Sequence, residues 1–334
     1  MAGVLAVPRD QVKVETHSSG DVHAVVRAAG LTFAVALTEA ASAGPVAIHA
    51  ERAARAARAV RKHIIPVVAV PYMGPSGKEV CARAGVSWLD YSGNAHIVGP
   101  GIRIIIDGRP NLSPKRGRPS SAFAPKSSRV ARWLLMHPTE ALAQRDISQV
   151  TGVSEGLVSR VVSRLEEERY IVRDDGGRVR LSNPQLLLEA WQDEYRFAKH
   201  IVLRGHVAAR SGDALTRSVA DALSAAKIDH AATGLSAAWQ LTRSVGFRTA
   251  TFFIEERQSA AVTKTVKENL GFRDDARGAN LWLAVPNDAG VFQGVEEKDG
   301  VRCVHPVQVY LDLKEHPERA AEAANRIRTE FLTW

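Results

Sequence analysis

Residues 128–181 read SRVARWLLMHPTEALAQRDISQVTGVSEGLVSRVVSRLEEERYIVRDDGGRVRL, and this stretch decides the fold of the central part of the chain. Apolar residues recur at helical spacing and predict helices over 128–137, 143–151 and 154–169. Gly152 permits the left-handed backbone of a tight turn between two helices, and Ser154 is a typical N-cap. The order of these elements predicts a helix-turn-helix.

The three helices are expected to share one apolar core. The inward residues are expected to be Val130, Trp133 and Leu134 in the first helix, Ile147 and Val150 in the second, and Val158, Val161, Val162 and Leu165 in the third. The third helix keeps a polar face opposite its apolar one. That face consists of Glu155, Gly156, Ser159, Arg160 and Ser163.

This polar face is the candidate DNA-binding surface. In a helix-turn-helix the N-terminal half of the second motif helix enters the major groove of DNA. We therefore expect Ser154, Glu155 and Ser159 to reach base edges or phosphates. Arg160 is expected to bind a guanine or a phosphate, and Ser163 is a further candidate on the same face.

Arg164 has two alternative roles. It can contact DNA, or it can pair with Glu168 at i,i+4 spacing and contribute nothing to binding. The whole stretch also has an alternative, which is a winged helix that binds protein. The basic residues on either side of the helices argue for DNA.

A hairpin follows the third helix. The segments 170–173 and 178–181 alternate as short strands do, and Asp174-Asp175-Gly176-Gly177 is a strong hairpin signal. Arg178 and Arg180 are expected to point outward from this wing and contact phosphate or the minor groove. The stretch is therefore predicted to be a winged helix-turn-helix.

A basic linker precedes the winged helix. Residues 109–127 are dense in Pro, Ser and Gly and are expected to lack packed elements. Within this linker, Lys115-Arg116-Gly117-Arg118-Pro119 resembles an AT-hook core, in which glycine lets the backbone enter a narrow minor groove between two arginines. The alternative is a solvated, flexible tether.

The segment before the linker predicts a small α/β domain. Residues 21–43 show helical spacing and 45–50 suggest a strand. The remaining expected elements are a helix over 51–63 with a basic stripe, a buried strand over 64–70, a helix over 74–85, and strands over 86–90, 95–98 and 102–107.

A nuclease is one alternative for this domain. Asp90 and Asp107 are expected at strand ends, with Lys78 and Glu79 near them in sequence. A restriction-type site needs carboxylates and a lysine on strands to hold Mg²⁺, whereas Lys78 falls on the expected helix. A degenerate restriction-endonuclease-like domain therefore fits better, and Asp90 with Asn94 is expected to set a turn.

The C-terminal half predicts a second α/β domain. Asn183-Pro184 begins a helix, and the other elements expected are helices over 213–227 and 258–270, a glycine turn and helix within 230–241, strands over 249–255 and 279–285, and helices opened by Pro306 and Pro317. A nucleotidyltransferase would need paired aspartates on the strand that carries Thr249 and Thr251. A degenerate nucleotidyltransferase-like domain is the alternative that remains. The isolated histidines His206, His230 and His305 lack a nucleophile or metal partner in sequence.

Composition limits the remaining classes. The chain has 334 residues, 45% of them apolar, and a net charge of +8, which favours a polyanionic partner. Cys81 and Cys303 have no metal-ligand spacing and suit a reducing compartment. No spanning segment or signal peptide is recognisable, so we expect a cytoplasmic protein without metal or cofactor.

Four further runs carry a family resemblance. These are VVAVPYMGPSGKEVCARAGVSWLDYSGNAHI (67–97), TGLSAAW (233–239), RGANLWLAVPND (277–288) and VHPVQVYLDL (304–313). With the winged helix between them, they resemble the AbiEi-like antitoxin family of type IV toxin–antitoxin systems over about residues 60–334. The resemblance implies a DNA-binding autoregulator that binds inverted repeats in its own promoter. It also implies a nucleotidyltransferase toxin that is opposed without a stable complex.

The sequence thus predicts an α/β multidomain regulator. The expected domains are an N-terminal α/β domain (1–108), the basic linker (109–127), the winged helix-turn-helix (128–182) and a C-terminal antitoxin-like domain (183–334). We expect a non-enzymatic homodimer on double-stranded DNA. The alternatives are a metal-dependent nuclease, a nucleotidyltransferase, or a transcription factor outside any toxin–antitoxin pair, since the family's usual form is shorter at its N-terminus.

Overall fold

The computed structural model describes residues 1–16, 20–59, 63–112, 121–274 and 278–334. These residues form two compact units. The first unit consists of Met1–Ser120, Ser163–Val172 and Gln185–Asp193, and the second of Ser121–Val162, Arg173–Pro184 and Glu194–Trp334. Among the described residues, no helix is long and apolar enough to cross a membrane.

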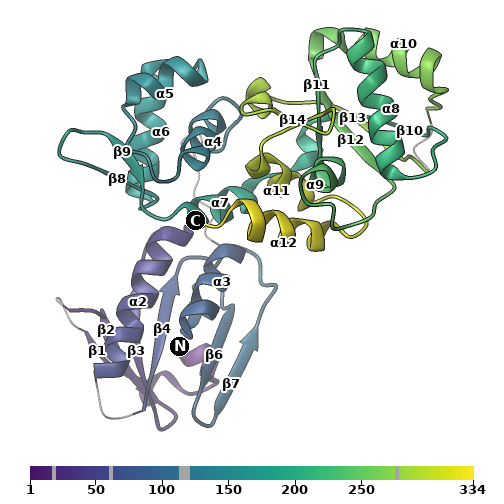
Figure 1. The fold of residues 1–334 in the computed structure, drawn as a ribbon. Coiled ribbons are helices and arrows are strands. Elements are labelled where there is room, and N and C mark those ends of the chain that lie inside the picture. The colour runs from purple at the N-terminus through teal and green to yellow at the C-terminus, as the bar shows by residue number, and fades with distance from the viewer. Residues whose placement is uncertain (17–19, 60–62, 113–120, 275–277) are drawn as a thin grey trace. The chain divides into compact units, whose positions relative to one another are not determined.

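A mixed sheet is the centre of the first unit (Figure 1). Its described strands follow chain order: β1 (Lys13–Thr16), β2 (Ala24–Ala28), β3 (Leu31–Leu37), β4 (Ile64–Val70), β5 (Ser87–Asp90), β6 (Ala95–Gly99) and β7 (Ile102–Ile106). The pairs β3–β4 and β4–β5 are parallel, and the others are antiparallel. Parallel neighbours need a crossover, which α2 (Ala43–Ala59) and α3 (Pro75–Ala84) supply.

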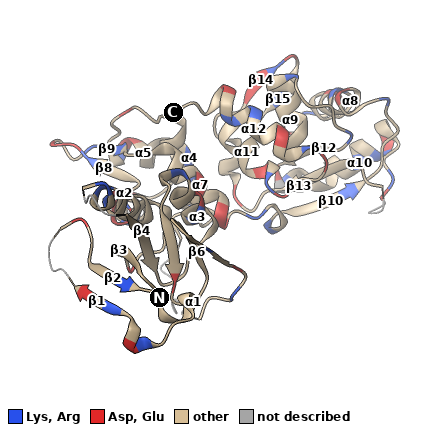
Figure 2. Ribbon diagram, turned by 90° about the horizontal axis from the view of Figure 1, so that it is seen from below, with Lys and Arg blue, Asp and Glu red and all other residues tan. Residues whose placement is uncertain are grey.

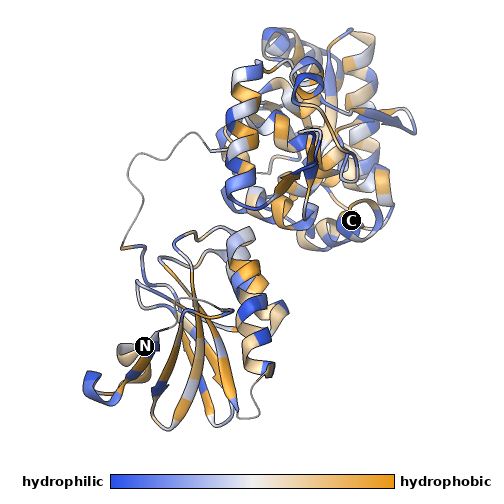
Figure 3. Cartoon of the chain, turned by 90° about the vertical axis from the view of Figure 1, so that its left-hand side faces the viewer, coloured by the Kyte–Doolittle hydropathy of each residue, from blue (hydrophilic) through white to orange (hydrophobic). Residues whose placement is uncertain are grey.

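One face of this sheet holds a continuous apolar core. Phe33, Val35, Val67 and Ile97 are buried in it, and the strands appear as apolar ribbons in Figure 3. Side chains of the chain start, including those at α1 (Ala2–Leu5), pack against this core, and the short helix η1 (Arg9–Gln11) follows. The sheet is therefore closed on this face by the chain's own first residues.

The predictions for residues 21–50 were wrong. Residues 21–43 hold the hairpin β2–β3 rather than a helix, and 45–50 lie inside α2 rather than in a strand. Burial in β2 alternates with a period of two, which is the strand pattern, although Val22, Val25, Val26 and Ala29 also match helical spacing. Ala29 and Gly30 have positive φ and turn the chain between the two strands.

The rest of the first unit follows the sequence prediction. Strands β4 to β7 and helix α3 lie where they were expected, and Gly85 ends α3 in the left-handed conformation. The helix predicted over 51–63 is the later part of α2, although residues 60–62 lie outside the described residues. The domain is therefore α/β, as predicted.

The winged helix is also confirmed. Helices α4 (Ser128–Met136), α5 (Gln144–Thr151) and α6 (Glu155–Glu167) precede the two-stranded wing of β8 (Ile171–Arg173) and β9 (Val179–Leu181). Leu142 adds an antiparallel bridge to Val179, with backbone hydrogen bonds of 2.8 and 2.9 Å. Helix α7 (Pro184–Glu194) begins at the predicted proline.

A second mixed sheet is the centre of the residues after α7 (Figure 1). Its described strands lie in the order β10 (Ile201–Gly205), β13 (Leu281–Val285), β12 (Ala250–Ile254), β11 (His230–Thr233), β15 (Val301–Cys303) and β14 (Glu296–Lys298). The helices are α8 (Gly212–Ala225), α9 (Gly234–Thr242), α10 (Ser259–Leu270), α11 (Pro306–Leu313) and α12 (Ala320–Phe331), with 3-10 turns at Phe197–Lys199, Glu256–Gln258 and Ala289–Phe292.

The C-terminal predictions were right for the longer elements. Helices α8, α10 and α11 and strands β12 and β13 lie where they were expected. Strands β10, β11, β14 and β15 were not predicted, and α12 begins at Ala320 instead of at Pro317. Strands β14 and β15 have three residues each, which is too short for a periodic signal, and β11 (His-Ala-Ala-Thr) contains a single β-branched residue.

Candidate nucleic-acid interface

The winged helix has a closed apolar core that holds α6. Val158, Val161, Val162 and Leu165 of α6 are at most 4% exposed. Val130 and Leu134 of α4, Ile147 of α5 and Val179 of the wing are also buried, and α4 contacts both α5 and the wing strand β9. One predicted core residue is wrong, because Val150 is 54% exposed and the turn of α5 places it on the outer side.

The turn between α5 and α6 has the predicted geometry. Gly152 ends α5 in the left-handed region, with φ 64° and ψ 24°. Val153 is buried beyond it, and the Ser148 hydroxyl donates to the Val153 carbonyl at 2.6 Å. The carbonyl of Ser154 accepts from the amides of Leu157 and Val158 at 2.9 Å, which starts α6.

The predicted reading face of α6 is exposed to solvent. Ser154, Glu155, Ser159, Arg160 and Ser163 are all exposed and lie opposite the buried valines. Within the part of the chain that the structure describes, Arg160 has no hydrogen bond or ion pair. Its guanidinium is therefore available for a phosphate or a base edge.

Arg164 forms the predicted pair with Glu168. Its Nη2 atom lies 2.5 Å from Glu168 Oε1, and its Nη1 atom lies 3.8 Å from Glu167 Oε2. These are i,i+4 and i,i+3 pairs on one helix face. The side chain is thus already neutralised in the free protein.

The wing is held by its own turn. The Asp174 carboxylate accepts from the amides of Gly176 and Arg178 at 3.0 and 2.8 Å, and Gly177 adopts φ 74°. Arg178 and Arg180 are both exposed, as predicted, and Figure 2 shows acidic residues at the wing's tip with basic residues on its strands. Arg173 on β8 is a further exposed arginine, which the sequence analysis included in the strand but not among the site residues.

The AT-hook-like segment cannot be placed. Lys115, Arg116, Gly117, Arg118 and Pro119 lie outside the described residues. Their role therefore remains a prediction from sequence.

Two arginines of α4 bind partners within the protein. Arg129 binds Asp288, in the loop after β13, through two hydrogen bonds of 2.7 and 2.9 Å. Arg132 is 2% exposed and donates to the side-chain oxygen of Gln308 on α11. Both arginines follow closely after the basic linker (109–127) in sequence, but their partners lie inside the protein. Their i,i+3 spacing beside the apolar face of α4 was the available signal.

A buried polar network continues from Arg132. Gln308 Nε2 donates to Asp312 at 2.8 Å and to the Tyr195 hydroxyl at 3.1 Å, and Tyr195 donates to Asp312. Burial raises the pKa of Asp312 to about 7, although hydrogen bonds from Thr233, Tyr195 and Gln308 oppose that rise. Burial also lowers the pKa of Arg132 to about 10, so Arg132 stays charged at neutral pH.

His200 completes this network. The Asn287 amide donates to His200 Nδ1 at 3.0 Å, so Nε2 carries the proton and faces the Tyr195 hydroxyl at 2.8 Å. Burial and, to a smaller extent, the charge of Arg132 lower the pKa of His200 to about 4. The imidazole is therefore neutral at physiological pH.

The residues considered for nuclease chemistry have structural roles. The buried Asp90 carboxylate accepts from the amides of Met73 and Asn94 and from the Asn94 side chain, which is the predicted turn. Lys78 lies on α3 and binds both carboxylate oxygens of Asp107 at 2.6 and 2.8 Å. Asp90 and Lys78 therefore bind different partners and do not bind each other.

The residues considered for nucleotidyl transfer also have internal partners. Thr251 Oγ1 lies 3.0 Å from His316 Nε2, and its amide donates to the Ser236 hydroxyl at 2.9 Å. The amide of Thr249 donates to Glu318 at 2.9 Å. Among the described residues, no group of three or more His, Cys, Asp or Glu side chains is placed to hold a metal ion.

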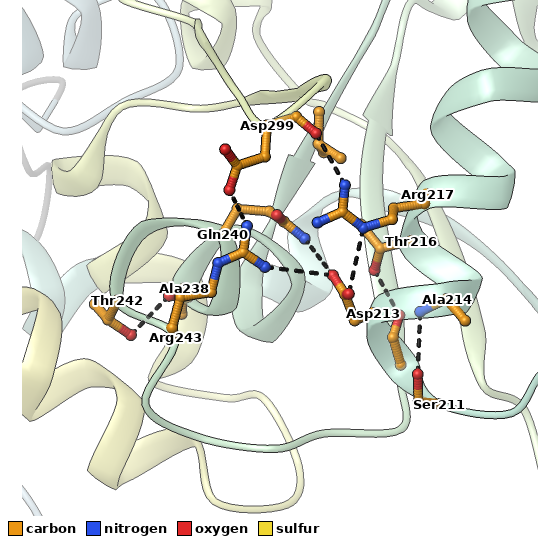
Figure 4. Close-up of polar contacts among 12 residues, drawn as sticks. Ser211, Asp213, Ala214, Thr216, Arg217, Ala238, Gln240, Thr242, Arg243 and Asp299 are labelled. Atoms are coloured by element: carbon orange, nitrogen blue, oxygen red, sulfur yellow. Dashed lines mark hydrogen bonds and ion pairs between the residues drawn. The ribbon is translucent and has the colours of Figure 1, made fainter.

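A half-exposed ion cluster surrounds Asp213 at the start of α8 (Figure 4). Asp213 accepts from Gln240 at 2.8 Å and from Arg217 at 3.3 Å, and Arg243 lies 3.6 Å away. Burial alone raises the pKa of Asp213, but the hydrogen bonds from Gln240 and Arg217 outweigh burial and lower it. Arg243 also binds Asp299 in the β14–β15 turn. The charges of the two arginines and the two aspartates cancel. Because Arg243 at the end of α9 binds both Asp213 and Asp299, the cluster connects the β14–β15 turn to α8 and α9.

The three isolated histidines have structural surroundings. His206 is exposed and forms a backbone bridge with Arg273. His230 is buried, its Nδ1 lies 2.8 Å from the Ile228 carbonyl, and burial lowers its pKa. His305 caps α11 by accepting from the Val307 amide at 3.2 Å, and burial lowers its pKa to about 4.

Comparison with known families identifies the class of both parts of the second unit. Residues 124–179 match the model of the MarR family, which agrees with the winged helix built above. This part of the chain is thus similar to the winged-helix domain of MarR-family proteins. Residues 180–333 match the model described as "Transcriptional regulator, AbiEi antitoxin, Type IV TA system". The resemblance to the AbiEi-like antitoxin and regulator family is confirmed. No curated protein matches the chain.

Proposed function

We propose that the chain is an autorepressing, antitoxin-type transcriptional regulator that reads duplex DNA through α6 and the wing. The exposed polar face of α6 carries this proposal, because Ser154, Glu155, Ser159 and Arg160 lie opposite a fully buried core. In a helix-turn-helix this half-helix is the part that enters the major groove. The exposed side chains of Arg178 and Arg180 on the wing support the proposal, in which they contact phosphates or the minor groove.

The proposal assigns different roles to different side chains. Arg160, which has no hydrogen bond or ion pair to any described residue, binds a guanine edge or a phosphate. Ser154, Ser159 and Ser163 donate to phosphates or bases, and Glu155 accepts from a base amino group such as that of cytosine. Arg164 has the smallest role in this assignment, since Glu168 already neutralises it.

The family match supports a toxin–antitoxin context. In this context the regulator acts as a homodimer on an inverted repeat in its own promoter, in the cytoplasm. It opposes a nucleotidyltransferase toxin without forming a stable complex. The role requires no catalytic residue, metal or cofactor.

An electrophoretic mobility shift experiment tests the proposal. The probe is a duplex of the DNA directly upstream of the coding sequence, and the competitor is a scrambled duplex of the same composition. With about 6–10 phosphate contacts, affinity is expected to fall by about 10³- to 10⁵-fold between 50 and 200 mM salt. A protein that shifts neither duplex at low salt is not the proposed regulator.

A further inference from the structure

Helix α4 has a second packed stripe besides its core face. Val130 and Leu134 are buried in the winged-helix core. Arg129, Arg132 and Met136, at i, i+3 and i+7, face the AbiEi-type region instead: Arg129 binds Asp288, Arg132 binds Gln308, and a side chain on Gly294 would collide with the Met136 methyl group. One helix therefore belongs to both parts of the second unit.

Arg129 joins three segments with one guanidinium. Its Nε and Nη2 atoms donate to the two carboxylate oxygens of Asp288 at 2.7 and 2.9 Å. Its Nη1 atom donates to the Thr151 carbonyl at 3.3 Å. The bidentate pair fixes the plane of the guanidinium, so the position of Asp288 determines where Nη1 points.

Asp288 is itself held in place. It is the N-cap of the 3-10 turn Ala289–Phe292, and its Oδ1 atom accepts from the Gly290 amide at 2.7 Å. A Cβ at Gly290 would lie 2.6 Å from Arg129 Cγ and 3.0 Å from Arg132 Nη1. The loop thus approaches α4 closely enough to require glycine.

The far end of this contact is the turn before the reading helix. Thr151 is the last residue of α5 and is 3% exposed. Gly152 reverses the chain, and α6 begins at Glu155. A carboxylate of the AbiEi-type region is therefore linked through one arginine to the turn that aims α6.

We propose that Asp288, acting through Arg129, positions α6 for DNA, so that both are positioning residues that do not touch DNA themselves. The inference rests on the DNA-reading function proposed above. It makes the AbiEi-type region part of the DNA-reading unit rather than a separate attachment.

Loss of positioning and loss of a negative charge change the affinity for the specific duplex in opposite directions. Asp288 is an acid close to a DNA-binding element, and removing a negative charge alone would strengthen binding to any duplex. Loss of positioning instead weakens binding to the specific duplex and leaves non-specific binding equal or stronger. The ratio of the two affinities separates these outcomes.

The first arm of the test needs no DNA. Amide hydrogen exchange is compared among wild type, Asp288→Asn, Arg129→Lys and the control Asp229→Asn, whose carboxylate binds exposed Arg302 in the same unit. Arg129→Lys keeps the positive charge but cannot form the two parallel hydrogen bonds that the guanidinium makes to the Asp288 carboxylate. We call this Arg129–Asp288 pair the clamp. Both clamp variants are expected to exchange faster at 152–158, whereas the control matches wild type. Unchanged exchange in both clamp variants overturns the proposal.

The second arm measures the two affinities on the upstream and scrambled duplexes. The ratio is expected to fall by about tenfold or more in Asp288→Asn and Arg129→Lys, as for a lost hydrogen bond to a charged group. A ratio equal to wild type in both variants overturns the positioning role. If wild type itself does not discriminate the duplexes while exchange at 152–158 changes, the clamp stands and the proposed function fails.

Discussion

Arg132 and Gln308 lie 176 residues apart in sequence, yet their side chains meet in a buried hydrogen bond between α4 and α11. Arg132 is 2% exposed, and Gln308 is fully buried. A buried arginine is costly unless it is paired, and here the carboxyl groups of Asp288 and Asp312 act on it. The first helix of the winged helix is therefore anchored in the polar interior of the AbiEi-type region.

The close approach at Gly290 gives the first prediction. Gly290→Ala is expected to lower the free energy of unfolding by about 1–3 kcal/mol, because the new methyl group collides with Arg129 and Asp288. Urea denaturation measures this change. Gly246→Ala is the matched control, since a Cβ there meets nothing within 4 Å, and it is expected to stay within about 0.5 kcal/mol of wild type. Equal stabilities for the two variants would contradict the packing described here.

Asp312 gives a prediction on pH. Burial raises its pKa to about 7, so between its ordinary pKa of 3.8 and pH 7 the folded protein holds a proton that the unfolded chain has lost. The contribution of Asp312 to the free energy of unfolding is fully present below pH 3.8 and is lost as the pH rises toward 7. Asp312→Asn removes this dependence, because the amide can still accept from Tyr195 and Gln308 while it donates to the Thr233 hydroxyl.

The stability of Asp312→Asn relative to wild type is therefore expected to rise between about pH 5 and pH 8, as measured by urea denaturation. The neighbouring His200 acts in the opposite direction, since burial lowers its pKa to about 4, and Arg132 and Tyr195 keep one charge state throughout this range. These groups are present in both proteins, so their contribution largely cancels in the difference. A difference that stays constant with pH would show that Asp312 is ionised in the folded protein.

The sequence was sufficient where structure depends on local pattern. Helices α4, α5 and α6 were placed within one or two residues, because apolar spacing and the turn residue Gly152 act over a few neighbours. Strand β11 was missed because two of its four residues are alanines, which are depleted in strands, whereas the equally buried β12 is rich in Phe and Ile. In β2, alanine and valine fitted both periods, and only pairing with β3 decides between them.

The residues of the candidate site also differ in how far the sequence could predict them. The outward face of α6 follows from helical periodicity, so Ser159 and Arg160 were found from sequence. Arg129 was not, since its partner Asp288 is 159 residues away and only the tertiary fold brings them together. Counting basic residues in the sequence cannot distinguish an arginine that is available to DNA from one that is paired inside the protein, as Arg129 and Arg132 are.

The AT-hook-like segment gives a prediction on sequence preference. Replacing Arg116 and Arg118 together by alanine is expected to weaken binding to upstream duplexes with A·T-rich flanks more than to those with G·C-rich flanks. The reason is the greater negative potential of a narrow A·T minor groove. Fluorescence anisotropy on matched duplexes that differ only in their flanks measures both affinities. Equal losses on the two duplexes would show that these arginines act as a non-specific tether.

Arg160 and Arg164 make the last comparison, because they lie on one helix and carry the same charge. Arg160→Ala is expected to reduce affinity for the upstream duplex by about 1–3 kcal/mol if it reads a guanine, or to lower the salt slope by about 1 if it binds a phosphate.

Arg164→Ala is expected to leave both quantities near wild type, since Glu167 and Glu168 already hold its guanidinium. Titrations at several salt concentrations measure affinity and slope together, and thermal unfolding checks that both variants are folded. An equal loss in the two variants would mean that α6 attracts DNA through total charge rather than through the exposed face that contains Arg160.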